Sequence, residues 1–163
     1  MAVQEPADSP RRWCFGCGDR NPHGLRISFR LDGERAIGEF AVRDVHQGWP
    51  GLAHGGIAAA ALDEAMGWAL YAAGAWAYTA KMEIKYRRPL RLGEKVTVAA
   101  ELTRSRGRWL EVRGEMRDAA GNLLAQSKGV FARLLEEEAR ALEAFYIAGP
   151  EAPSRVDDES AGP

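Results

Sequence analysis

The most prominent pattern along the chain is a nearly continuous apolar run from residue 56 to residue 78. The run is long enough to raise the question of a membrane span. Asp63 and Glu64 lie inside it, however, and two carboxylates near the middle of a bilayer are costly. Alanine occupies most sides of a helix drawn through residues 55–73 and leaves no continuous polar face. The pattern therefore predicts a helix that is wholly buried inside a domain, where alanine lets a sheet approach closely.

Strand patterns lie on both sides of this helix, and Pro, Gly and an Ala-Gly-Asn turn mark the breaks between them. The predicted strands cover residues 25–31, 35–42, 77–88, 94–103, 108–117 and 122–134. In the run at 77–88 the period of two places Thr79 and Tyr86 on opposite faces. A short amphipathic helix is predicted at residues 134–146.

The order of these elements predicts the fold class. One long helix between two early strands and four later ones indicates an α+β domain, in which an antiparallel sheet curls around one central helix. This is the outline of the hot-dog fold. The length of 163 residues is that of one ordinary domain. We assign the domain, with its short C-terminal helix, to residues 13–148, and we predict disordered tails at 1–12 and 149–163 because both ends are polar and rich in proline.

The overall charge, the N-terminus and the two cysteines determine which partners, location and metals we expect. The chain has 22 Lys and Arg against 23 Asp and Glu, so no overall charge favours nucleic acid or an anionic membrane. The N-terminus has no apolar core of signal-peptide length, which predicts a cytoplasmic location. Cys14 and Cys17 form a CxxC pair that cannot supply a four-ligand zinc site without help, and His23 is the only nearby extra ligand. We therefore expect these cysteines to be buried or loop thiols and predict no bound metal.

Two features of the predicted helix carry candidate chemistry. Gly55 and Gly56 at its start expose backbone N–H groups without a Cβ to block approach, which suits a developing oxyanion. Glycine is also tolerated at a helix entry without any function. Asp63 lies in apolar surroundings, where a charged group is costly unless it has a partner or a catalytic purpose. Glu64 points about 100° away on the helix, so only one of the two carboxylates is expected to face a site.

These residues belong to a wider set of four separated features. The set comprises His54-Gly55-Gly56 at the helix start, Asp63 nine positions after the histidine, Thr79 at the opening of the next strand, and Tyr86 and Pro89 at its close. Together they resemble the hot-dog acyl-CoA thioesterases of the PaaI-like branch. The resemblance covers about residues 14–134. Any one feature alone would be a weak signal, and the match in four places makes the combination specific.

The resemblance implies a reaction and a division of roles. It implies hydrolysis of an acyl-CoA to the free acid and CoA, without a metal or an organic cofactor. Asp63 would act as general base or nucleophile. His54 would help to position the thioester carbonyl, and Gly55 and Gly56 would hold the oxyanion. Thr79 would hold Asp63 or its water molecule by a hydrogen bond, although threonine is also common at strand starts without function.

Substrate contacts are expected beside these residues. The family often carries an amide just before the His-Gly-Gly, and Gln47 is the nearest amide here, seven residues before His54. CoA carries phosphates, and four cations lie close together in the sequence at Lys85, Arg87, Arg88 and Arg91. We predict that these residues bind the substrate. Solvated strand charges are an equally good explanation of the cationic cluster.

The resemblance also implies a homodimer, or a tetramer built from two such dimers. His54 and Asp63 are nine residues apart, which is about 13 Å along a helix. No single thioester can touch both residues of one chain. Two helices packed antiparallel across a two-fold axis would bring His54 of one chain near Asp63 of the other.

Three alternatives remain open at this stage. A hydroxyacyl-thioester dehydratase also uses a helix carboxylate and a histidine, but in a differently spaced, proline-rich loop. A non-catalytic acyl-CoA or lipid-binding module would need none of Asp63, Thr79 and His54. A metal or redox protein would depend on the two cysteines alone. Thioester hydrolysis explains more of the sequence than any of these.

Overall fold

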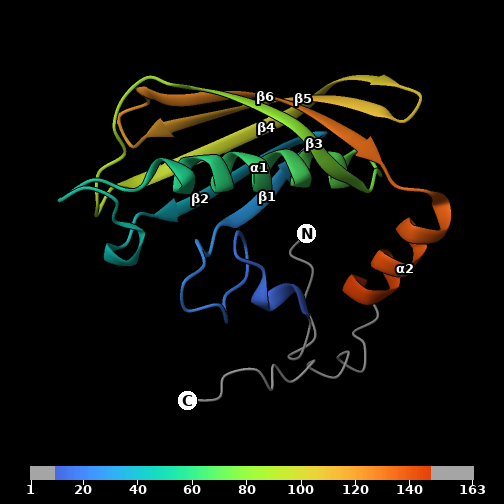
Figure 1. The fold of residues 1–163 in the computed structure, drawn as a ribbon, viewed down its shortest axis with the longest axis horizontal. Coiled ribbons are helices and arrows are strands. Elements are labelled where there is room, and N and C mark those ends of the chain that lie inside the picture. Colours follow the sequence, from blue (N-terminus) through green and yellow to red (C-terminus); the bar gives the residue numbers. More distant parts are fainter. Residues whose placement is uncertain (1–9, 148–163) are drawn as a thin grey trace, which may run out of the picture.

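A single sheet and one long helix make up most of the computed structural model, which describes residues 10–147 (Figure 1). The elements in chain order are η1 (Pro10–Trp13), β1 (Ser28–Asp32), β2 (Arg35–Ala41), η2 (Asp44–His46), α1 (Gly55–Ala72), β3 (Ala77–Tyr86), β4 (Lys95–Arg106), β5 (Trp109–Asp118), β6 (Leu123–Arg133) and α2 (Glu136–Ile147). The six strands are antiparallel in the order β1-β2-β4-β5-β6-β3. The sheet arches over α1, so the predicted α+β hot-dog fold is confirmed.

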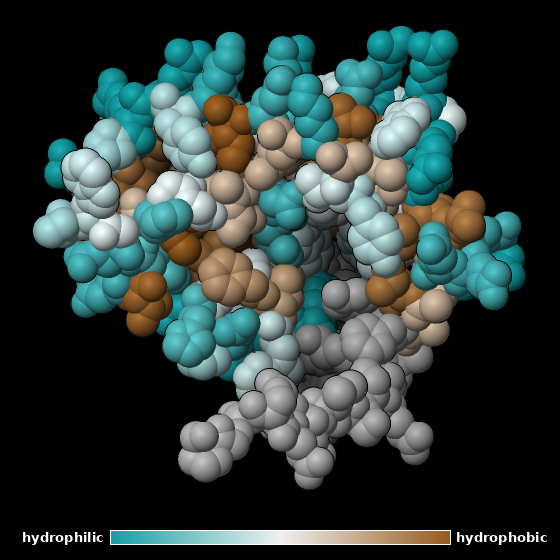
Figure 2. Space-filling model, viewed as in Figure 1, coloured by the Kyte–Doolittle hydropathy of each residue, from teal (hydrophilic) through white to brown (hydrophobic). Residues whose placement is uncertain are grey.

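The outer face of the sheet is hydrophilic. Teal side chains cover the side that points away from α1, at the top of the view (Figure 2). On β5, Glu115 accepts hydrogen bonds from Arg117 at 2.9 Å and from Arg35 of β2 at 3.0 Å. These guanidinium groups, Arg117 first, hold the pKa of the Glu115 carboxyl below its usual range. Side chains therefore alternate between this charged face and the apolar face that covers α1.

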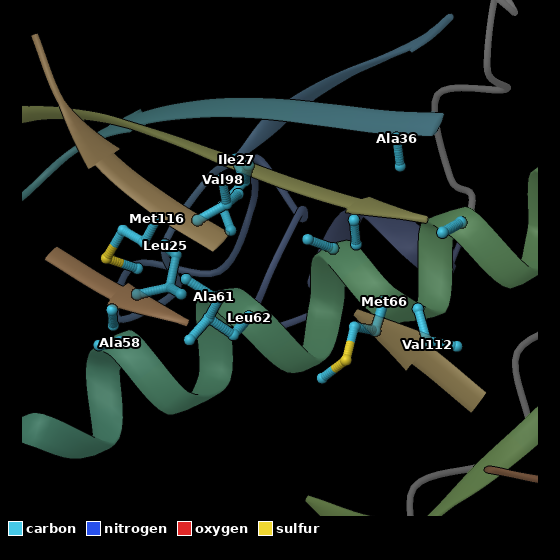
Figure 3. Close-up of a cluster of buried hydrophobic side chains, with 14 of the residues drawn as sticks. Leu25, Ile27, Ala36, Ala58, Ala61, Leu62, Met66, Val98, Val112 and Met116 are labelled. Carbon is cyan, nitrogen blue, oxygen red and sulfur yellow. The ribbon is translucent and has the colours of Figure 1, made fainter. Parts of the chain in front are cut away.

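The core lies between the inner face of the sheet and one side of α1. Figure 3 shows Leu62 and Met66 of the helix in one cluster with Val98, Val112 and Met116 of the strands. The sheet carries glycine at two positions that face helix side chains, Gly114 of β5 and Gly129 of β6. A Cβ at Gly129 of β6 would lie 2.9 Å from the Met66 sulfur. Small residues on the strands thus allow the close approach of helix and sheet that the alanine-rich sequence predicted.

The helix is buried on one side only. Its buried residues form the stripe Ala58, Ala61, Leu62, Ala65, Met66, Ala69 and Leu70. On the opposite side Gly67 and Tyr71 are exposed, and Asp63 is half-buried. The prediction of a wholly buried helix is therefore wrong for the single chain, because the one sheet covers only the side of α1 that faces it.

A β-bulge changes the face that one predicted site residue occupies. Thr79 of β3 pairs with Phe131 of β6, and Lys81 pairs with Val130, so Ala80 is an extra residue in the ladder. The bulge shifts the alternation by one position and places Thr79 on the same face as Tyr86, toward α1. The prediction that Thr79 and Tyr86 lie on opposite faces is therefore wrong, because it did not include the bulge at Ala80.

The ends of the domain differ slightly from the predicted ones. Residues 10–12, assigned above to the N-terminal tail, belong to η1, where the Arg12 guanidinium donates to Asp19. The predicted tail segments 1–9 and 149–163 lie outside the described residues. In the described range, no helix combines the length and the apolar character needed to cross a membrane.

Candidate active site

The N-terminus of α1 is capped by a histidine. His54 is the N-cap residue, and its Nδ1 accepts the backbone N–H of Gly56 at 2.9 Å. Because an accepting nitrogen carries no hydrogen, the ring proton lies on Nε2, and the exposed ring can donate it to a ligand. Within the described residues the Gly55 N–H has no acceptor. Of the two glycine N–H groups predicted to hold an oxyanion, Gly55 is thus the one left available, since Gly56 is engaged by the cap.

A hollow of about 290 Å³ opens beside this helix start. It is lined by Ala53, His54, Gly55, Ala58, Tyr86, Arg87, Arg88, Pro89, Leu90, Met116, Leu124 and Ala125. The Tyr86 hydroxyl donates to the Gly55 carbonyl at 3.1 Å, which ties the end of β3 to the first turn of α1. The hollow therefore combines an apolar floor, a helix N-terminus and two arginines at its wall.

Asp63 and Thr79 form a hydrogen-bonded pair on the open side of α1. The Thr79 hydroxyl donates to Asp63 Oδ1 at 2.7 Å. The bulge at Ala80 makes this contact possible, because it turns Thr79 toward the helix. Asp63 lies about 13 Å along the helix from His54. One chain therefore brings Asp63 together with Thr79, and His54 together with the glycines, but it does not bring the two groups together.

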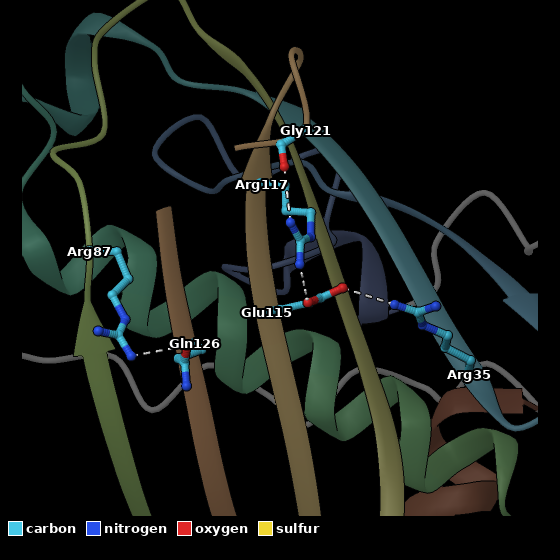
Figure 4. Close-up of polar contacts among 6 residues, drawn as sticks. All are labelled: Arg35, Arg87, Glu115, Arg117, Gly121 and Gln126. Atoms are coloured by element: carbon cyan, nitrogen blue, oxygen red, sulfur yellow. Dashed lines mark hydrogen bonds and ion pairs between the residues drawn. The ribbon is translucent and has the colours of Figure 1, made fainter. Parts of the chain in front are cut away.

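The four predicted cations separate into two pairs. Arg87 and Arg88 line the hollow, and the Arg87 Nη2 donates to Gln126 Oε1 at 3.5 Å (Figure 4). Lys85 and Arg91 are exposed and do not line it. The sequence cluster predicted one cationic surface, whereas the structure places only its central pair beside the helix start.

Comparison with known proteins identifies the family. A model of the thioesterase superfamily matches residues 50–125. A mutant form of the phenylacetic acid degradation protein PaaI of Thermus thermophilus is 30% identical, over 68% of this chain and 95% of that protein, with a TM-score of 0.63. The chain belongs to the thioesterase superfamily, in its PaaI-like branch.

Other solved structures share the fold. A crystallised thioesterase superfamily protein is 29% identical over 74% of this chain, with a TM-score of 0.70, and the match spans 60% of the length of that protein. A protein of Streptococcus mutans, crystallised with acetyl CoA, is 17% identical over 66% of this chain and 88% of that protein, with a TM-score of 0.64. No functionally curated protein matches this PaaI-like chain.

Gln47 of the PaaI-like chain lies outside the hollow. Its side-chain Oε1 accepts the Gly51 N–H at 3.2 Å, and its backbone forms a bridge with Ala53. The amide therefore braces the turn that leads into α1. Its predicted contact with substrate stays a prediction.

A second histidine supports the helix start and was not singled out from the sequence. His46 is 2% exposed, and its Nδ1 accepts the Arg43 N–H at 3.1 Å. Its carbonyl accepts the N–H of His54 at 2.9 Å. Burial, followed by the charge of Arg43, lowers the pKa of His46. A histidine in a turn-rich stretch gives no periodic signal, so only the fold could reveal this contact.

Glu64, adjacent to Asp63, faces the N-terminal loop instead. The Cys14 Sγ lies 3.6 Å and 3.5 Å from its two carboxylate oxygens, and Trp68 Nε1 donates to it at 3.2 Å. Hydrogen bonding from the Cys17 side chain lowers the pKa of Cys14 to about 7, with the backbone N–H groups of Cys17 and Gly16 adding to the effect. The same thiol contact and burial raise the pKa of Cys17. The two neighbouring carboxylates of α1 thus contact different elements.

Proposed function

We propose that this protein hydrolyses an acyl-CoA thioester to a carboxylic acid and CoA. The observation that carries the proposal is the Asp63–Thr79 pair, a carboxylate held at 2.7 Å by a hydroxyl on the side of α1 that its own sheet leaves open. Membership of the thioesterase superfamily supports the same reaction.

The chemistry needs little more than a carboxylate and an oxyanion site. As general base, Asp63 takes a proton from water while the water oxygen attacks the thioester carbon. As nucleophile, it attacks directly and forms an anhydride that water then hydrolyses. In both routes the carbonyl oxygen becomes an oxyanion, for which the Gly55 N–H and the His54 Nε2–H are the available donors. The carbon–sulfur bond then breaks and CoA leaves as its thiolate.

The complete site in this proposal belongs to two chains. Asp63 and His54 are too far apart along α1 to reach one carbonyl, while the open side of the helix in the single chain presents Asp63, Gly67 and Tyr71. Antiparallel packing of two such helices across a two-fold axis would bury this side and join Asp63 of one chain to His54 of its partner. A homodimer is therefore part of the proposed function, and a tetramer of two dimers is compatible with it.

In this proposal the phosphates of CoA bind at the arginine wall of the hollow, and the thioester end of the substrate lies at its His54 and Gly55 side. Arg87 and Arg88 at its wall supply the planar donors that suit phosphate oxygens. The Streptococcus mutans relative bound to acetyl CoA supports CoA as a ligand of this fold. The cytoplasmic location expected from the sequence remains a prediction.

The direct test is a thiol-release assay with acyl-CoAs from acetyl to palmitoyl and with aryl-acetyl-CoA. We expect at least one substrate to release CoA, and Asp63→Asn to lower kcat at least about a hundredfold, the scale of losing a positioned base. Circular dichroism checks that the variant stays folded. A folded Asp63→Asn protein with normal turnover would remove Asp63 from the mechanism. CoA binding without any release would identify a binding module instead of an enzyme.

A further inference from the structure

Two thiols and one carboxylate converge on the side of α1 away from the Asp63–Thr79 pair. The ligand atoms of Cys14, Cys17 and Glu64 all lie within 4.8 Å of one another, and all three side chains are half-buried. The cysteines come from the loop after η1 and the glutamate from the third turn of α1. This convergence joins positions that are 50 residues apart in the sequence.

The loop that contains the two cysteines packs tightly against the Glu64 carboxylate. Gly16, between them, is buried, and a Cβ there would lie 2.4 Å from the carboxyl carbon of Glu64. A Cβ at Gly18 would lie 2.5 Å from the Cys14 carbonyl, so the turn is equally tight on its other side.

The separation between Cys14 and Glu64 matches that of two ligands on one ion. Zinc binds sulfur at about 2.3 Å and carboxylate oxygen at about 2.0–2.2 Å, so two such ligands at a tetrahedral angle lie about 3.5 Å apart. The Cys14 sulfur lies 3.5 Å and 3.6 Å from the Glu64 oxygens. The Trp68 N–H donates to the same carboxylate, as outer partners of metal ligands commonly do.

We propose that Cys14, Cys17 and Glu64 bind one Zn²⁺ ion per chain, with water or an external ligand in the fourth position. Glu64 is the third ligand that the sequence did not identify, and it replaces the expectation of a metal-free CxxC. Both sulfurs bind as thiolates, so two thiol protons pass to the solvent. The ion would fasten the N-terminal loop to α1. A disulfide between the two cysteines is the competing use of the pair, and it would leave the position of Glu64 unexplained.

The test is zinc binding by the full chain after reduction and removal of metal with a chelator. We expect one zinc per chain after gel filtration, and Co²⁺ in its place should give a sulfur-to-cobalt charge-transfer band. Cys17→Ser and Glu64→Gln should each weaken zinc binding at least about tenfold, since even outer-partner changes cost that much. His23→Ala, and Glu39→Gln at an exposed carboxylate of β2, are the matched controls and should leave binding unchanged.

Each other outcome overturns the assignment. Wild-type protein with two free thiols that retains no zinc contradicts the site, whether or not the variants fold. Formation of a Cys14–Cys17 disulfide, combined with no zinc binding after reduction, would identify a redox pair. Loss of zinc in His23→Ala but not in Glu64→Gln would identify a different ligand set. None of these results bears on thioester hydrolysis, because the proposed hydrolytic residues are not zinc ligands.

Discussion

At the scale of single residues, Thr79 is the group that fixes the proposed catalytic carboxylate. Its hydroxyl donates to Asp63 Oδ1 at 2.7 Å, and a hydrogen bond to a charged group contributes about 1.5–3 kcal/mol. We expect Thr79→Val, which keeps the shape but removes the hydroxyl, to lower kcat by about tenfold or more. Thr79→Ser restores a hydroxyl and should recover most of the rate. Equal rates for the valine and serine variants would show that this hydrogen bond has no part in turnover.

His46 is the residue whose charge state should link stability to pH. Its pKa in the folded protein is lowered by burial, whereas an unfolded histidine titrates near about 6.5. The unfolded chain therefore binds more protons below that pH, and the stabilisation from neutral His46 is complete above about pH 6.5 and is lost as the pH falls through the folded pKa. Urea unfolding between about pH 5 and 7.5 measures this dependence.

The matching variant is His46→Asn, which keeps an acceptor for the Arg43 N–H but cannot titrate. We expect it to be less stable than the wild type at neutral pH and to lose less stability on acidification. Asp19, Glu115 and Asp118 have lowered pKa values because of hydrogen-bond partners, so their contribution is lost at more acidic pH. Parallel stability curves for wild type and variant would exclude His46 as the source of the slope.

The sequence identified some of these residues and missed others for clear reasons. Asp63 could be selected because a carboxylate inside an apolar helix is conspicuous. The direction of Thr79 could not be predicted, since one extra residue at Ala80 reverses the face of every residue beyond it. The contact of Glu64 with Cys14 spans 50 residues and depends on how the N-terminal loop returns to α1.

At the scale of elements, the end of β3 delivers two arginines to the helix start. Arg87 and Arg88 line the hollow beside His54, while Lys85 and Arg91 do not. If CoA phosphates bind there, Arg87→Ala with Arg88→Ala should raise KM for acyl-CoA about tenfold or more, the scale of losing charged hydrogen bonds. The same double variant should have an unchanged KM for a short acyl thioester that lacks the nucleotide.

The control for this experiment lies in the same segment. Lys85→Ala with Arg91→Ala removes the same charge from exposed positions outside the hollow and should change KM little. If the control raises KM as much as the arginine pair, the effect comes from overall charge and not from the hollow. If the arginine pair impairs both substrates equally, those arginines serve the reaction centre instead of the nucleotide.

Element order and approximate bounds could be predicted because the local patterns agree with the fold. Alternation, turn glycines, the alanine-rich run and the amphipathic pattern after the last strand give all six strands and both α-helices within a few residues. The open side of α1 could not be predicted, because composition does not reveal that a single sheet covers a helix whose residues are apolar all round. The same composition suits burial by a second chain.

At the scale of the whole molecule, the account depends on two chains completing each other's sites. The asymmetry of α1, with one side buried by its own sheet and Asp63 on the other, is the structural basis for this dependence. His54 and Asp63 are separated by about 13 Å along one helix, so a single chain offers each thioester only half of the required groups. In an antiparallel dimer, each of the two sites would contain Asp63 of one chain and His54 of the other.

Complementation between inactive variants tests this central claim most directly. Asp63→Asn and His54→Ala are unfolded and refolded together in equal amounts, and thiol release from the best acyl-CoA substrate is measured. With random pairing half the dimers are mixed, and each mixed dimer holds one intact site, so about a quarter of wild-type activity should return. Each variant refolded alone provides the baseline. Confirmed mixed dimers with no activity above that baseline would contradict a site shared between Asp63 of one chain and His54 of its partner.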